Sequence, residues 1–165
     1  MWRMRLGEQW VASGLLSSSQ VEAALDYQAR WGGRLGEVAV VMGLLTSEQL
    51  LVALARQHQL PFVRREGLER VPDGLLRCVP SRMLSRLHVF PLRIEWPDQG
   101  PGHLLLATSE PERQGVLDEM ALATGCRVRP VLALADDLTH VLWRHGLFAG
   151  RLPAAGSAGA DVSVL

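Results

Sequence analysis

Lysine is absent from this chain of 165 residues, and all 17 of its basic residues are arginine. This absence argues against every chemistry that needs a lysine, including a phosphate-binding-loop lysine, a Schiff-base lysine and a protein-kinase lysine. Genomic base composition is a sufficient reason for the arginine usage. The absence therefore narrows the reaction classes without indicating a function.

Cysteines and long apolar runs are also scarce. The two cysteines, Cys78 and Cys126, show neither metal-ligand spacing nor a disulfide framework, so we expect both to be buried as small hydrophobic residues. The longest apolar run, Val38–Leu45, is far shorter than the roughly 20 residues of a membrane-spanning helix. Glu8 and Gln9 lie where a secretory signal would have its apolar core. We expect a cytoplasmic protein without membrane insertion.

An excess of positive charge is missing too, because 17 acidic residues balance the 17 arginines. A general nucleic-acid binder needs a basic surface, so we expect no nucleic-acid partner. The five histidines lack partners at metal-ligand spacing, and the sequence predicts no metal site. The adjacent carboxylates Asp136 and Asp137 are interpreted as a helix N-cap, since neighbouring residues on a helix point apart.

An internal repeat fills the first third of the chain. Residues 5–28, the first copy, read RLGEQWVASGLLSSSQVEAALDYQ, and residues 34–57, the second copy, read RLGEVAVVMGLLTSEQLLVALARQ. The period is 29, and 13 of the 24 aligned positions are identical. Ordinary composition would give about two identities.

Each copy predicts two short helices joined by a turn. The first helix begins near Leu6 or Leu35 and stops at Gly14 or Gly43, because glycine commonly ends a helix in the left-handed conformation. The second helix has a capping box in each copy, made by Ser17 with Gln20 and by Thr46 with Gln49. Residues 29–33 are expected to be a short flexible connector.

Packing of the two hairpins explains the repeated leucines, but it does not explain the repeated arginine, glycine and glutamine. Arg5 and Arg34 precede their helices and belong to no apolar face. A shared ligand role and simple surface exposure both remain open for them. Arginine can pair with guanine or phosphate, and a glycine lets a ligand approach backbone amides at a helix start. A site used twice suits a two-fold symmetric ligand such as a cyclic dinucleotide with two guanines.

The two 24-residue copies and their five-residue spacer resemble the MshEN-type cyclic-di-GMP-binding domain. That domain forms the N-terminal region of many assembly ATPases of type II secretion and type IV pilus systems. The resemblance implies cyclic-di-GMP as the ligand and no other cofactor. It implies ligand contacts at Arg5, Leu6, Gly7, Gly14, Leu25, Gln28, Arg34, Leu35, Gly36, Gly43, Leu54 and Gln57. Trp10, Ala39 and Val21 depart from the pattern but keep it apolar.

The second half predicts a small α/β unit. Residues 61–75 are interpreted as a connection, followed by a helix over 81–87 and strands over 89–94 and 103–108. A helix opened by residues 109–111 and ending at Gly125, a strand over 126–131 and a last helix over 134–143 complete it. We therefore expect an α+β fold: a four-helix unit from two helical-hairpin repeats, then a small α/β subdomain.

Three segments of the second half resemble the same family. They are LRCVPSRMLSRLHVFPL at 76–92, LLLATSEP at 104–111 and TGCRVRPV at 124–131, with Glu110 where the family has aspartate. The resemblance then covers about residues 3–146 and ends before any motor domain. We expect a ligand-binding subdomain over 1–60, the α/β subdomain over 61–148 and a disordered Gly/Ala-rich tail over 149–165.

The sequence is compatible with two functions. The first is a stand-alone, non-catalytic cyclic-di-GMP receptor that passes the signal to a protein partner in secretion, pilus or motility machinery. The second is a protein-interaction module that has lost the ligand and docks on a type II secretion or type IV pilus component. A DNA-binding role is disfavoured by the neutral charge.

We predict that the purified chain does not hydrolyse ATP or cyclic-di-GMP. The chain has no lysine and no GxxxxGK[ST] loop to hold the phosphates of a nucleoside triphosphate. Release of phosphate or of a linear dinucleotide would be followed by chromatography. Turnover that rises in proportion to protein concentration would contradict this prediction.

Overall fold

The computed structural model describes residues 5–147, which divide into two units, residues 5–53 and residues 54–147. The division lies within a helix, and the subdomain boundary expected after residue 60 stays a prediction. The tail expected to be disordered, 149–165, lies outside the described residues. The helices and the small sheet confirm the α+β fold that the sequence predicts.

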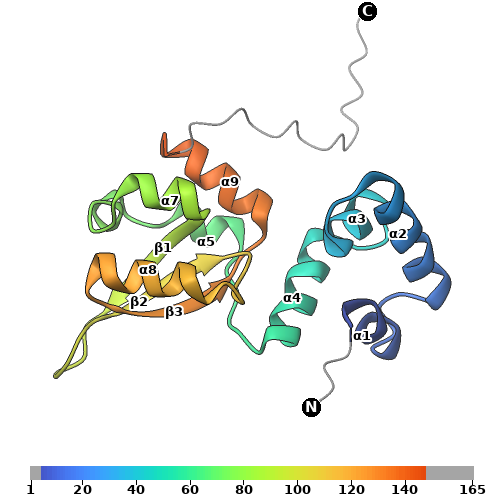
Figure 1. The fold of residues 1–165 in the computed structure, drawn as a ribbon, viewed down its shortest axis with the longest axis horizontal. Coiled ribbons are helices and arrows are strands. Elements are labelled where there is room, and N and C mark those ends of the chain that lie inside the picture. Colours follow the sequence, from blue (N-terminus) through green and yellow to red (C-terminus); the bar gives the residue numbers. More distant parts are fainter. Residues whose placement is uncertain (1–4, 148–165) are drawn as a thin grey trace, which may run out of the picture. The chain divides into compact units, whose positions relative to one another are not determined.

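The first unit contains the helices of the repeat (Figure 1). They are α1 (Leu6–Ala12), α2 (Ser18–Trp31), α3 (Leu35–Val41) and the first part of α4 (Ser47–His58). Each copy thus forms two helices joined by a turn, as its sequence predicts, although the second helix is longer than the first. The predicted connector over 29–33 is wrong in its bounds, because α2 continues through Trp31 and only Gly32, Gly33 and Arg34 lie between α2 and α3. Gly32 and Gly33 both have positive φ.

The turns of the two copies repeat the same backbone hydrogen bonds. Gly14 and Gly43 have φ of 70° and 71°, a left-handed conformation that favours glycine. In each copy the glycine N–H donates to the carbonyl oxygen three residues earlier. The next two N–H groups donate to the carbonyl of Trp10 in the first copy and of Ala39 in the second. The predicted glycine terminators are confirmed.

Both predicted capping boxes are confirmed as well. The Ser17 hydroxyl accepts from the Gln20 N–H at 3.2 Å, and the Gln20 side chain accepts from the Ser17 N–H at 2.8 Å. Thr46 and Gln49 make the same pair of bonds at 3.1 and 2.9 Å. These bonds satisfy N–H groups that a helix start leaves without partners.

Close helix contacts in each copy depend on a glycine. A Cβ added to Gly7 would lie 2.7 Å from Cγ1 of Val21, and a Cβ added to Gly36 would lie 2.6 Å from Cδ1 of Leu50. Val21 and Leu50 are separated by the repeat period and both are buried. The two copies therefore pack their helices through the same glycine contact. The core around them contains Trp10, Leu16, Ala24, Val38, Ala39, Leu45 and Leu51.

The second unit is built on a three-stranded sheet in the order β1 (Val89–Glu95), β2 (His103–Thr108), β3 (Arg127–Leu132). Strands β1 and β2 are antiparallel, and β2 and β3 are parallel through the crossover helix α8 (Gln114–Thr124). The chain at residues 61–63 extends the edge of β3, where the Val63 N–H donates to the Leu132 carbonyl at 2.9 Å.

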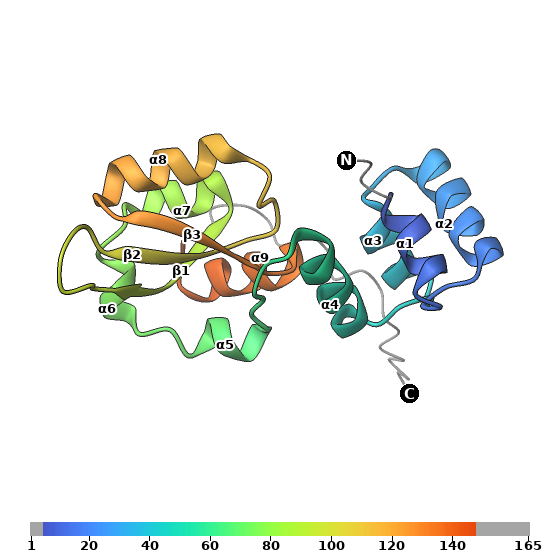
Figure 2. The same cartoon turned by 90° about the horizontal axis from the view of Figure 1, so that it is seen from below.

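Short helices complete this unit: α5 (Arg65–Glu69), α6 (Asp73–Leu76), α7 (Ser81–Leu87) and α9 (Ala135–Arg144). Figure 2 shows α8 on one side of the sheet and α5 and α9 on the other. The core between these layers includes Leu84, Phe90, Leu104, Leu106, Met120, Leu138 and Leu142. Among residues 5–147, no helix combines the length and apolar character needed to cross a bilayer.

Three expectations about this unit are corrected. The segment 61–75 is more than a connection, because α5 buries Leu68 completely and α6 follows it. Helix α8 begins at Gln114 and not at residues 109–111. At residues 109–111 the chain forms a turn, in which the Thr108 hydroxyl accepts a hydrogen bond from the Glu110 N–H. Cys78 is exposed, while Cys126 is buried as expected.

The interpretation of Asp136 and Asp137 as a helix cap is also wrong. The N-cap of α9 is Leu134, which makes no side-chain cap bond. Asp137 is buried and accepts from Arg65 Nε at 2.8 Å, so it joins α9 to α5. Arg65 and Asp137 are 72 positions apart in the sequence, so local residue spacing does not indicate that they pair.

The substitution Gly7→Ala tests the glycine contact. Val21 is β-branched and buried, so its Cγ1 has few alternative positions. We expect a loss of about 1–3 kcal/mol in the free energy of unfolding from overpacking, which outweighs alanine's gain in helix propensity. Urea unfolding followed by circular dichroism measures it.

The matched control is Gly115→Ala, also at the second position of a helix but with nothing within 4 Å of the added Cβ. It should be neutral or stabilising by up to about 1 kcal/mol. Equal effects of the two substitutions would contradict the packing role of Gly7.

Candidate ligand-binding site

The starts of the two copies lie next to each other in the first unit. A Cβ added to Gly7, in the first copy, would lie 3.7 Å from Cδ2 of Leu35, in the second. Both Leu6 and Leu35 are half-buried, whereas Gly7 and Gly36 are buried. Residues that the sequence places 28 positions apart therefore share one small region.

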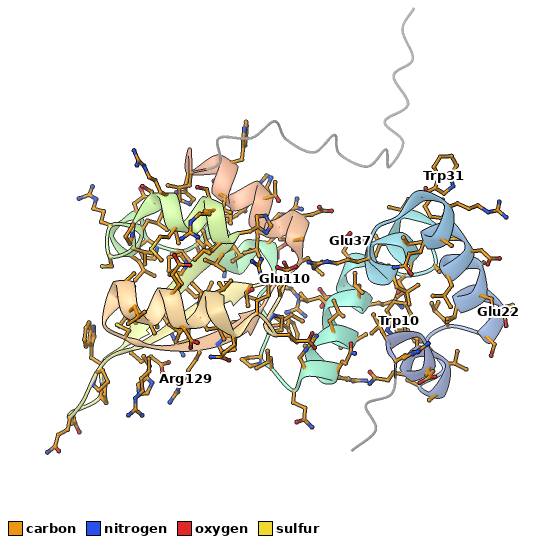
Figure 3. The ribbon with its side chains drawn as sticks, viewed as in Figure 1. Trp10, Glu22, Trp31, Glu37, Glu110 and Arg129 are labelled. Atoms are coloured by element: carbon orange, nitrogen blue, oxygen red, sulfur yellow. The ribbon has the colours of Figure 1, made fainter. Side chains whose placement is uncertain are left out.

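The two arginines occupy equivalent positions in this region. Arg5 and Arg34 are the N-cap residues of α1 and α3, with extended backbones and exposed side chains. The Arg5 N–H donates to the Glu8 carboxylate at 2.9 Å, which fixes the start of α1. Figure 3 labels Glu37, the residue of the second copy that matches Glu8.

Leu25 is unlike the leucines of the core, because 45% of its surface is exposed to solvent. The buried stripe of α2 contains Val21 and Ala24 instead. Packing of the two hairpins therefore does not account for Leu25, although it explains the repeated leucines that are buried. An exposed leucine on the helix that carries Gln28 is available to an apolar part of a ligand.

Gln28 connects the first copy to the beginning of the second. Its side-chain Nε2 donates to the Gly33 carbonyl at 2.8 Å, immediately before Arg34. This hydrogen bond holds Gly32 and Gly33 against the end of α2. It offsets the backbone freedom of two consecutive glycines, which is larger than that of any other residue. The glutamine of one copy thus lies beside the arginine of the other.

The remaining expected residues have structural roles or lie at the end of α4. Gly14 and Gly43 are exposed and terminate α1 and α3. Leu54 and Gln57 are half-buried in the last turns of α4, past the division between the units. Ligand contacts of all these residues stay predictions.

The sequence pattern does not single out the residues that hold this region together. Val21 and Leu50 contact the repeated glycines, and their signal is an apolar residue at the same place in each copy. Nor does it indicate Trp31 (Figure 3), which is 76% exposed. The ring centroids of Trp31 and Tyr27 lie 6.4 Å apart. The second copy has arginine in place of Tyr27, so periodicity gave no indication of this pair.

The chemistry of this region suits binding. It offers two exposed guanidinium groups, an exposed leucine and a glutamine amide. Guanidinium groups donate hydrogen bonds in a planar fork and cannot act as bases near neutral pH. Across residues 5–147, no group of three or more His, Cys, Asp or Glu side chains is placed to hold a metal ion.

Comparisons with known proteins agree on one family. The sequence profile of the MshEN domain matches residues 58–152. The structure is similar to that of MshE with cdg (cyclic-di-GMP), with a TM-score of 0.67, 28% identity, and coverage of 86% of this chain and 99% of the other. No curated protein sequence matches this chain significantly.

A second solved structure supports the fold alone. The N-terminal domain of XpsE has a TM-score of 0.54 and 19% identity, covering 88% of this chain and 94% of that chain. The profile match covers more than half of the sequence and lies mainly in the second unit, while the similarity to MshE extends over most of both. The chain belongs to the MshEN domain family.

Proposed function

We propose that this chain is a cyclic-di-GMP receptor that binds one ligand molecule across its two copies. The observation that carries the proposal is the contact region between Gly7 and Leu35, which brings the two Arg-Leu-Gly starts together. A ligand with two guanines and two phosphates can use both arginines only where the two starts are neighbours. The similarity to MshE with its bound ligand supports the same assignment.

Each feature of the region matches one part of such a ligand. Arg5 and Arg34 would each pair with a guanine edge or a phosphate, since a guanidinium fork fits both. The exposed Leu25 would contact the flat face of a base, which explains why this leucine is not buried. Leu54 and Gln57 would give the second copy the contacts that Leu25 and Gln28 give the first.

The chain acts by binding, without catalysis. Its site residues are arginine, leucine, glycine and glutamine, none of which is a nucleophile or a general base at neutral pH. The signal would therefore pass to a protein partner in secretion, pilus or motility machinery, as the family suggests. Loss of ligand binding would favour the alternative of a docking module in the same machinery.

Alanine at either arginine tests the two-copy binding mode. If each arginine recognises one guanine, Arg5→Ala and Arg34→Ala should each weaken cyclic-di-GMP binding by about five- to 150-fold, the value of a bidentate contact of about 1–3 kcal/mol. Lysine at either position should not restore affinity, because it lacks the planar fork. Isothermal titration calorimetry gives the affinity and the stoichiometry of one ligand per chain.

Arg30→Ala is the matched control, since Arg30 is an exposed arginine on α2 outside the repeated pattern. It should bind like the parent protein. Linear pGpG should bind more weakly than the cyclic ligand, because its free ends must be ordered on binding. Unchanged binding in both alanine variants, or no binding by the parent, would exclude the receptor and leave the docking module.

A further inference from the structure

One end of the sheet in the second unit presents a charged face. Arg93 of β1, Leu105 of β2 and Arg129 of β3 are directly paired across the strands and so share a face. The neighbouring row on the same face is Glu95, His103 and Arg127. We call this set the arginine face: Arg93, Glu95, His103, Leu105, Arg127 and Arg129.

The helices leave the arginine face uncovered, although they bury the rest of the same sheet surface. Ala107 and Val131, further along the strands on this side, are buried. In contrast, His103 and Leu105 are only half-buried, and the Arg93 and Arg129 side chains are 66% and 60% exposed. Figure 3 shows Arg129 projecting from β3.

Positive charge on this face exceeds its negative charge. Glu95 is the single carboxylate, and it lies 2.5 Å from Arg93 and 3.9 Å from Arg129. Arg127 forms no ion pair with any residue in the described range 5–147. A chain with no net charge thus places three arginines on one exposed face, and arginine is enriched in protein interfaces.

The side chains of this face, and not the strand edge, are suited to a partner. Strands β1 and β3 are both outer strands, and each contains a proline, Pro91 or Pro130, that has no N–H to donate to an added strand. Residues 61–63 already pair with the end of β3 at Leu132. Strand addition would therefore find few free donors, whereas the arginine face is open.

We propose that the arginine face is a docking surface for an acidic, partly apolar segment of a partner protein. Carboxylates of the segment would pair with Arg127 and Arg129, and an apolar side chain would cover Leu105. Arginine pairs with carboxylates through two parallel hydrogen bonds, which gives the contact a defined geometry. A nucleic acid is less suited, because Glu95 lies between the arginines and would face phosphates.

This surface lies within the second unit and does not depend on cyclic-di-GMP binding. The test uses the full ¹⁵N-labelled chain without nucleotide and a synthetic peptide of about twelve residues that alternates Glu with Leu. We expect amide shifts to cluster on β1, β2 and β3 at the residues of the arginine face. Affinity should fall as salt rises, because exposed charges are screened.

Charge reversal supplies the decisive comparison. Arg127→Glu should weaken peptide binding at least about fivefold, by replacing attraction with repulsion. Arg82→Glu, which makes the same change at an exposed arginine on α7, should leave binding unchanged. Both variants change a surface side chain, and circular dichroism verifies that each remains folded.

Several outcomes would overturn the proposal. They are no binding of the acidic peptide, equal binding of a peptide with Lys in place of Glu, equal losses in the two variants, or shifts located elsewhere. Tighter binding of single-stranded DNA at the same residues would assign the face to nucleic acid. Self-association that Arg127→Glu abolishes would assign it to a second copy of this chain.

Discussion

The close approach of two helices at a glycine is the contact on which the first unit depends. Gly7 lies against Val21 and Gly36 lies against Leu50, at distances that leave no room for a Cβ. Because the second helix of each copy lies directly on the start of the first, the residues on either side of the glycine are fixed in position. The arginine before it is exposed at the helix N-cap, and the start of one copy contacts the start of the other.

This arrangement converts a sequence repeat into a candidate site with two related halves. One Arg-Leu-Gly start on a short helix has too little surface for a specific ligand. Two starts held together can divide a symmetric ligand between them, and each half contributes the same types of group. The copies are not identical, however: Trp10 fills a core position that Ala39 holds in the second copy, and the contact of Tyr27 with the exposed Trp31 belongs to the first alone.

The second unit is organised by contacts of longer range. A parallel pair, β2 and β3, requires the crossover helix α8, and the buried Asp137 joins α9 to α5 through Arg65. A buried carboxylate is costly without a partner, so this pair specifies how the two helices meet. The same sheet remains uncovered at one end, where Arg93 of β1 and Arg127 and Arg129 of β3 share the arginine face.

The sequence by itself determined the repeat, which a direct comparison of its two copies reveals. It also determined the capping boxes, the glycine terminators and the three strands, because these depend on residues close together in the chain. Only the tertiary structure decided that Leu25 is exposed, that Asp137 pairs with Arg65, that Gly7 meets Leu35 and that Arg93, Arg127 and Arg129 share one face. Each of these depends on which elements pack together. Periodicity identifies the apolar side of a helix, but it does not say which neighbour covers that side or how far the cover extends.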